Sequence, residues 1–379
     1  MKKLLTVLLV LAIAGSVFAG GGKDSGAAAS TNRGATMIGM AMPETHVLRW
    51  MKDGTSLVTE AQKRGYFGAV NWAGGDQLVQ NQQIQSFLTQ GAKAIIVGCI
   101  NDGVAPVIAE AKRDGVKVVA YDRVIMNSED YDYFITFNNF NVGEHQGQAI
   151  AKALNLDAAT TAAPKNIALF AGSPTDGNAF FFFDGAMSIL KPFIDKGVLK
   201  IVGPAPLASS DTANFLRIAT EGWDAARAKT RMENLLNGEA ASVTLDAVLA
   251  PNDPIARAII EACRADAKYR TRLPVVTGQD AEFPSVLSVK NGEQYMTIFK
   301  DTSKLAAAAV LIADAILKGQ TPNVPGAVIA ESIGLGAIGD TGKKRVTTYL
   351  LEVTAITKDN ILVPVNAGFF TDAEAAQLK

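Results

Sequence analysis

The chain has 379 residues, of which 48% are hydrophobic and 19% charged, and this composition excludes a disordered or collagen-like protein. The length allows two domains with separate cores. Because 36 basic residues face 37 acidic ones, there is no basic excess to favour nucleic-acid binding. Two cysteines and two histidines are too few for a disulfide framework or a thiolate zinc site, so we expect no metal and no cofactor. Cys99 and Cys263 lie in apolar runs and are expected to be buried.

The N-terminus has the three parts of a secretory signal. Two lysines follow Met1, residues 4–14 are apolar, and Val17-Phe18-Ala19 carries small residues where signal peptidase reads them. The apolar run is too short for a permanent membrane anchor. We therefore expect a signal peptide over residues 1–19, cleavage before Gly20, a flexible leader over 20–35, and a periplasmic or otherwise exported protein.

From residue 36 onwards, apolar runs typical of buried strands alternate with stretches that have the 3.6-residue period of helices. In the first half the expected strands are 36–42, 67–72, 94–100 and 116–121, and the helices are 48–64, 78–90 and 104–113. The pattern restarts with strands at 166–171, 199–203, 245–250, 274–278 and 295–299, and helices at 177–196, 224–237, 256–267 and 303–318. The strand at 134–137 has no helix before it, as expected for a segment that crosses between units. This order predicts two α/β units with parallel sheets covered by helices.

Motifs for catalysis are missing or misplaced. Residues 334–339 (GLGAIG) match the spacing of a dinucleotide-binding loop, but no helix is expected after them, so a surface loop is favoured. There is no G-x-S-x-G or H-E-x-x-H sequence. His145 beside Glu144 fits an acid/base pair, but a lone solvated histidine on a helix is the favoured explanation. We expect a protein that is not an enzyme.

Polar and aromatic residues recur where the expected strands end. Ligands of parallel α/β sheets bind outside the carboxyl ends of the strands. The residues at these ends include Arg49, Trp50, Asp122, Arg123, Asn138, Asn139, Asp176, Asn178, Asn252, Asp253, Gln279, Asp280 and Lys300, and Trp223 adds a second indole. Taken singly, several have simpler explanations: a salt-bridged loop at 122–123, a helix cap at 252–253, a solvated Lys300 and a core Trp223. Their recurrence at one topological position favours a ligand site.

This set of side chains suits a sugar. Each hydroxyl donates and accepts hydrogen bonds, so a carboxylate and a guanidinium together can satisfy it. The apolar C–H face of a pyranose stacks on an indole. Charge-assisted hydrogen bonds contribute roughly 1.5–3 kcal/mol each, and a group left unpaired by the wrong epimer allows discrimination.

From residue 38 to the C-terminus the chain resembles the periplasmic monosaccharide-binding proteins of ABC importers, closest to the D-xylose-binding and multiple-sugar (glucose/galactose)-binding branch. The resemblance rests on local motifs in five places: Gly39–Pro43 followed by Arg49-Trp50, Val119–Arg123, Asn178–Met187, Val276–Glu282 and Thr297–Asp301. Three stretches depart from the family pattern. Asn138-Asn139 replaces Asp-Asn, Asp176-Gly177-Asn178 replaces Asp-Asn-Asn, and residues 204–222 are longer and unlike their counterparts.

The resemblance implies the type I periplasmic binding protein fold, with two doubly wound parallel-sheet domains joined by three crossing strands. It implies an N-terminal lobe of residues 36–138 and 301–346, a C-terminal lobe of residues 139–300 and 347–379, and a hinge at 138–140, 299–301 and 346–350. Sugar hydroxyls would be bound by Arg49, Asp122 and Arg123 of the first lobe and by Asn178, Asn252, Asp280 and Lys300 of the second. Trp50 would form a wall or stack on the sugar, and Trp223 would be the stacking partner.

We therefore expect an exported, monomeric receptor that closes on a neutral aldose of the glucose, galactose or xylose type and docks on a membrane ABC permease. A ligand such as ribose, a nucleoside or a signalling furanose is the alternative within the same class. An exported sugar-active enzyme would need paired carboxylates around a scissile bond. A sugar-responsive transcription regulator would need a DNA-binding helix pair before residue 36, where the signal peptide and leader lie.

Overall fold

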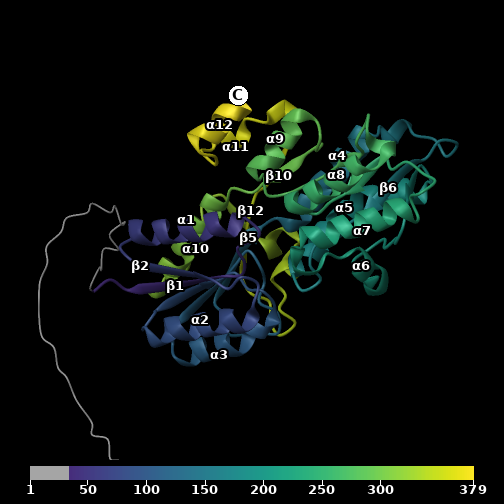
Figure 1. Cartoon of the computed structure of the whole chain (residues 1–379). Coiled ribbons are helices and arrows are strands. Elements are labelled where there is room, and N and C mark those ends of the chain that lie inside the picture. The colour runs from purple at the N-terminus through teal and green to yellow at the C-terminus, as the bar shows by residue number, and fades with distance from the viewer. Residues whose placement is uncertain (1–33) are drawn as a thin grey trace, which may run out of the picture. The chain divides into compact units, whose positions relative to one another are not determined.

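A seven-stranded sheet organises the first part of the computed structural model, which describes residues 34–379 (Figure 1). The expected signal peptide and nearly all of the expected leader lie outside these residues. The strand order is β11-β12-β5-β4-β3-β1-β2, and every neighbouring pair is parallel except β11–β12. The strands are β1 (Met37–Met42), β2 (Phe67–Trp72), β3 (Ala94–Val97), β4 (Lys117–Tyr121), β5 (Tyr133–Phe137), β11 (Ala327–Ile329) and β12 (Thr348–Leu351).

Helices cover both faces of this sheet because its central strands are apolar on both sides. Successive residues of β3 belong to different cores: Ile96 packs in the cluster that contains Leu57 of α1, and Ile95 packs in the cluster that contains Phe87 of α2. Figure 1 shows α1 and α10 on one side of the sheet and α2 and α3 on the other. These helices are α1 (Arg49–Lys63), α2 (Gln77–Thr89), α3 (Ala105–Arg113) and α10 (Thr302–Leu317). We call this sheet with these four helices the first lobe.

The second lobe is built on a four-stranded parallel sheet in the order β7-β6-β8-β9 and an antiparallel pair, β10–β13. Its strands are β6 (Lys165–Leu169), β7 (Leu199–Ile201), β8 (Ala247–Leu249), β9 (Val275–Val276), β10 (Thr297–Phe299) and β13 (Thr354–Ile356). Its helices are α4 (Asn139–Ala153), α5 (Gly177–Asp195), α6 (Thr212–Ile218), α7 (Ala225–Asn237), α8 (Asp253–Ala265), α9 (Phe283–Asn291), α11 (Val363–Asn366) and α12 (Asp372–Leu378).

Helices α4 and α5 touch backbone to backbone through glycines. A Cβ on Gly143 of α4 would overlap the carbonyl oxygen of Phe182, and one on Gly185 of α5 would overlap that of Phe140. Helix α4 was anticipated only in placing His145 on a helix, and its bounds were not predicted. Glycine lowers helix propensity by about 1 kcal/mol, and the glycines that allow this packing also weaken the helical signal. Helix α9 was not expected.

The chain crosses between the lobes three times. It leaves β5 for α4 at Asn138, and it leaves β10 for α10 at residues 300–301. The third crossing was expected at 346–350, and this is wrong. Strand β12 stays paired with β5 up to the Leu351–Phe137 partners, so the crossing lies at residues 352–353. Residues 347–351 therefore belong to the first sheet and not to the C-terminal lobe, because parallel pairing with β5 continues to the end of both strands.

Two smaller expectations are confirmed, the lack of a helix after the GLGAIG loop and the burial of both cysteines. The GLGAIG segment forms short 3-10 turns, and the chain then continues to β12 without an intervening α-helix. Cys99 and Cys263 are both buried and unpaired with each other. No helix within residues 34–379 has the length and apolar character needed to cross a membrane.

Candidate functional site

All nine residues predicted to bind a ligand line one cavity between the two lobes. The cavity has a volume of about 30 Å³, which is close to the share of a single water molecule. The predicted residues are Arg49, Trp50, Asp122, Arg123, Asn178, Trp223, Asn252, Asp280 and Lys300, and the structure adds Val47, Asp176, Phe182 and Gln279 to the lining.

The residues meet because each follows the carboxyl end of a strand or begins the next helix. Arg49 and Trp50 begin α1 after β1, and Asp122 and Arg123 follow β4. From the second lobe, Asn178 begins α5 after β6, and the loops after β8, β9 and β10 supply Asn252, Asp280 and Lys300. Trp223 ends a short turn before α7. The carboxyl ends of parallel strands meet at one sheet edge, and here the two edges face the same cavity.

Arg49 is surrounded by carboxylates from both lobes. Its Nη2 atom lies 2.7 Å from Asp53 Oδ2 and 2.9 Å from Asp122 Oδ2, and its Nη1 atom lies 3.8 Å from Asp280 Oδ1 in the second lobe. Although burial alone would raise it, Arg49, Lys300 and Arg123 lower the pKa of Asp122. The site therefore holds a fixed negative charge on Asp122 next to a buried guanidinium.

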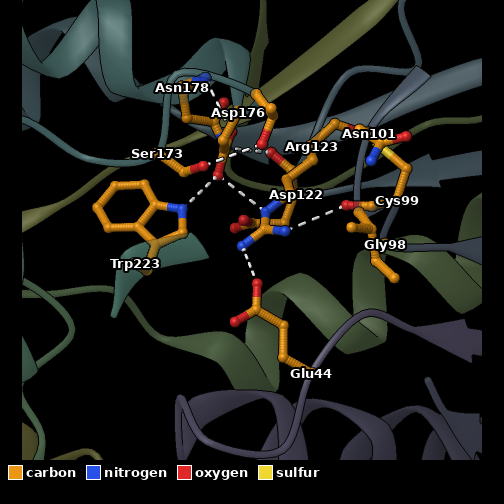
Figure 2. Close-up of polar contacts among 12 residues, drawn as sticks. Glu44, Gly98, Cys99, Asn101, Asp122, Arg123, Ser173, Asp176, Asn178 and Trp223 are labelled. Atoms are coloured by element: carbon orange, nitrogen blue, oxygen red, sulfur yellow. Dashed lines mark hydrogen bonds and ion pairs between the residues drawn. The ribbon is translucent and has the colours of Figure 1, made fainter. Parts of the chain in front are cut away.

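Arg123 connects the two lobes in a second charged group (Figure 2). Its Nη2 atom donates to Glu44 Oε1 (2.7 Å), its Nη1 atom donates to the carbonyl of Cys99 (3.2 Å), and its Nε atom lies 2.8 Å from Asp176 Oδ2 in the second lobe. Although burial alone would lower it, Asp176 and Glu44 raise the pKa of Arg123. The guanidinium is therefore held as a cation at any physiological pH.

The two tryptophans have different surroundings. The guanidinium groups of Arg49 and Arg123 lie 4.8 and 5.1 Å from the centre of the Trp50 ring, which is 2% exposed. Trp50 thus supports both arginines by cation–π contacts and forms a wall of the cavity. The Trp223 ring packs against Gly172, where a Cβ would overlap it, and its Nε1 atom donates to Asp176 Oδ2 (3.2 Å).

The second lobe contributes further buried polar groups. Lys300, 3% exposed, lies 3.0 Å from Asp280 Oδ1. The Asn178 side chain donates to the carbonyl of Asp122 across the lobes (2.9 Å) and accepts from Asn139 Nδ2 (2.7 Å). Asn252 caps α8 by accepting from the backbone of that helix, which leaves its amide nitrogen as the group available to a ligand.

Three of the predicted residues have left-handed backbone conformations that non-glycine residues rarely adopt. The φ angles are 63° at Asp122, 58° at Trp223 and 94° at Asp280. Such conformations cost about 1–3 kcal/mol each and cluster at ligand sites, where the surrounding structure maintains them. Their occurrence at three residues that line one cavity is a second, independent sign of a functional site.

Several polar atoms of the cavity are buried without an aligned hydrogen bond. Within residues 34–379, Asp122 Oδ2, Arg123 Nε and Asp280 Oδ1 reach only ion-pair distance of their partners, and Gln279 Oε1 has no partner. Buried polar atoms are normally hydrogen-bonded. A larger cavity of about 860 Å³ lies elsewhere in the second lobe and contains none of the nine residues. Converging buried charges, not size, identify the cavity between the lobes as the candidate site.

The fold and the site can now be compared with known proteins. Residues 38–321 match the family model described as "Periplasmic binding protein domain". The chain belongs to the periplasmic binding protein family. The multiple sugar-binding periplasmic receptor ChvE of Rhizobium radiobacter is 39% identical over 348 residues, covering 90% of this chain and 92% of that protein. The D-xylose-binding periplasmic protein of Haemophilus influenzae is 34% identical, covering 88% of this chain and 90% of that protein.

A solved ABC transporter solute-binding protein from Clostridium phytofermentans, with β-D-glucose bound, matches with a TM-score of 0.80 and 35% identity. The match covers 91% of this chain and 100% of that one. Together these similarities confirm the predicted fold of a type I periplasmic binding protein. The family and these relatives are binding proteins, and the relatives' names place them in the periplasm or with ABC transporters.

Sequence reasoning missed Asp53 and Glu44, two of the carboxylates that hold the arginines of this periplasmic binding protein, and it singled out Asp176 without assigning it to an arginine. Asp53 lies one helical turn after Arg49 on α1, a spacing at which side chains meet, and this signal was available. Glu44 follows the motif at Gly39–Pro43, and Asp176 follows a predicted strand. Their pairing with Arg123 was not readable, because it joins segments 79 and 53 residues away in the sequence.

Two further contacts join the lobes outside the cavity. His46 of the first lobe lies 2.9 Å from Glu44 Oε2 and 3.1 Å from the carbonyl of Gly222 in the second lobe. The hydrogen bond to Glu44 raises the pKa of His46; burial opposes this, and Asp224 adds to it. On α1, Lys52 donates to the carbonyl of Phe369 of the second lobe (3.2 Å) and lies 4.4 Å from the centre of the Phe369 ring.

Proposed function

We propose that this chain is an exported receptor that binds a neutral aldose between its lobes and delivers it to a membrane ABC permease, without catalysing a reaction and without a cofactor or metal. One observation carries the proposal: nine polar and aromatic residues from both lobes, predicted from the strand ends and from the family resemblance, converge on one buried cavity. The similarity to multiple-sugar, xylose-binding and glucose-bound relatives supports the choice of an aldose.

The charges of the site favour a neutral, hydroxyl-rich ligand. The cations Arg49, Arg123 and Lys300 are each already paired with a carboxylate of the protein, so an anionic ligand would face those carboxylates. A hydroxyl can instead donate to Asp122 or Asp280 and accept from a cation at the same time. The unaligned polar atoms described above are the groups that such hydroxyls would satisfy, and Trp223 is the proposed stacking partner.

Binding is proposed to couple to closure of the lobes. A cavity of about 30 Å³ is too small for a monosaccharide, so the ring enters only when the lobes separate. Ion pairs from Arg49 to Asp280 and from Arg123 to Asp176 connect the lobes at the site. A sugar that bonds to both lobes only in the closed form shifts the equilibrium towards closure through this difference in affinity.

The remaining features complete the same proposal. The hinge lies at the three crossings, at Asn138, 300–301 and 352–353, and the lobes comprise residues 36–138 with 301–351 and residues 139–300 with 352–379. Export uses the signal peptide of residues 1–19, with cleavage before Gly20, and the mature protein is a periplasmic monomer. The closed form, in which both lobes have fixed positions, is the form that docks on the permease.

The test is calorimetric titration of the mature protein with D-glucose, D-galactose, D-xylose, L-arabinose and D-ribose. We expect at least one of the first three to bind, and NMR of the recovered sugar to show it unchanged. Arg49→Gln should abolish binding, and the same substitution at exposed Arg113 should leave it intact. Failure of all five sugars to bind, or equal binding by both variants, would contradict the proposal.

A further inference from the structure

A separate cavity lies in the second lobe behind the ends of β6 and β7. Its volume is about 310 Å³, and it shares no lining residue with the cavity between the lobes. It is lined by Leu169, Phe170, Val202, Pro204, Arg217, Arg231, Asn234, Leu235 and Glu239. Part of the wall comes from Pro204 and from Arg217 of α6. Both lie in residues 204–222, the segment that differs from the family pattern. The proposed sugar site gives this cavity no role.

The unusual group in this cavity is Arg231 of α7. Its guanidinium stacks on Phe170, with 3.6 Å between its central carbon and the ring centre, and its Nη1 atom donates to the carbonyl of Arg217 (3.1 Å). Its Nη2 atom is buried and has no hydrogen-bond partner within residues 34–379. No carboxylate of the described chain forms an ion pair with it, although Arg49 and Arg123 each have at least two acidic neighbours.

The electrostatics agree with this geometry. Burial lowers the pKa of Arg231 to about 9, and no neighbouring carboxylate opposes the shift. A pKa near 9 still leaves the group cationic at neutral pH. Arg231 is half-buried, and its Nη2 donor is fully buried without a hydrogen bond to any described residue. A buried donor without a partner is destabilising, so an anion that accepted from Nη2 would remove that cost.

The rest of the lining restricts the size and character of such an anion. Leu169, Val202 and Leu235 form apolar walls, Asn234 offers an amide, and Glu239 is exposed. A volume of about 310 Å³ is at the lower end of the range for small-molecule pockets. Arginine is the side chain best suited to bind the planar or tetrahedral oxygens of a carboxylate or phosphate.

We propose that this cavity is a second ligand site, which binds a small molecule carrying a carboxylate or phosphate group on Arg231. The oxyanion accepts a hydrogen bond from Nη2, and the remainder of the molecule packs against Val202 and Leu235. The site is independent of the sugar, because the two cavities are lined by different residues.

The test measures the thermal unfolding midpoint of the mature protein in increasing inorganic phosphate or acetate, the minimal forms of the two oxyanions. Sodium chloride at the same ionic strength is the reference. We expect a saturable rise with at least one of the two anions, and Arg231→Met should abolish it. Arg227→Met, on the same helix but exposed and paired with Asp224, should preserve the rise.

Neither Arg227 nor Arg231 lines the cavity between the lobes. Normal calorimetric binding of the sugar that wild type binds therefore shows that each variant is folded. Should Arg231→Met not fold, Arg231→Lys keeps the charge but not the planar fork of donors, and we expect at least tenfold weaker anion binding. The proposal is overturned if neither anion gives a saturable rise, or if the rise is unchanged in the Arg231 variants.

Discussion

Removing the charge of Asp280 provides a quantitative test of the site. In Asp280→Asn the shape is kept, and asparagine tolerates the left-handed backbone at this position, but Lys300 loses the carboxylate 3.0 Å away. Leaving one partner of a buried pair without the other costs about 3–5 kcal/mol. When the lobes are open, water reaches both groups, so the cost falls mainly on the closed, sugar-bound form. Sugar affinity should therefore fall about 100- to 5,000-fold.

The assay is calorimetry with the sugar that wild type binds best, combined with thermal unfolding of the sugar-free protein. Because the open form is little affected, the sugar-free unfolding midpoint should change by no more than about 3 °C. Asp211→Asn, the same substitution at an exposed helix cap, should bind normally. A loss of affinity smaller than tenfold, or a sugar-free destabilisation of the full 3–5 kcal/mol, would refute the reasoning.

Three more predictions follow from the contacts. In Gly172→Ala the added methyl group should push the Trp223 ring from its position. Overpacking of this kind costs about 1–3 kcal/mol, and sugar binding should weaken by that amount. Calorimetry showing normal affinity would contradict the proposal that Trp223 must hold this position to bind the sugar. Lys52→Met should remove the contact with Phe369, worth about 0.5–1 kcal/mol, and weaken binding two- to fivefold; a stronger affinity would mean that the contact does not favour closure. The hydrogen bond to Glu44 of the same lobe is the largest cause of the raised pKa of His46, but the carbonyl of Gly222 and Asp224, both of the second lobe, add to the rise when the lobes are closed. Protonation of His46 therefore favours closure. Sugar affinity should thus be highest below pH 6.5 and fall as the pH rises through the higher pKa, whereas His46→Gln should be insensitive over that range, and an unchanged pH profile in this variant would refute the assignment.

The alternation of strands and helices was predictable because each β–α step is encoded locally, in an apolar run for the strand and a 3.6-residue period for the helix. The same local code placed Asp122 and Asp280 at strand ends, where topology alone brings them together. The third crossing was mispredicted, because the pairing of β12 with β5 depends on partners more than 200 residues apart. No local pattern in residues 346–353 marks where that pairing stops.

The internal organisation of the site was less predictable than its membership. Trp50 was expected to be a wall or a stacking surface, and its packing beneath two guanidinium groups depends on the relative placement of α1 and the end of β4. The contacts of His46 and Lys52 with the second lobe depend on how the lobes close, which no single segment encodes. Residue types at strand ends thus predict which residues line the site, and tertiary packing decides which of their charges are paired.

The most direct measurement of the central claim is a crystal structure of the mature protein grown with saturating sugar from the calorimetric panel. We predict one sugar ring between the lobes, within hydrogen-bond distance of Arg49 and Asp122 on one side and of Asp280 and Lys300 on the other, with Trp223 against its face. A sugar held by one lobe only, or bound outside this cavity, would contradict the account.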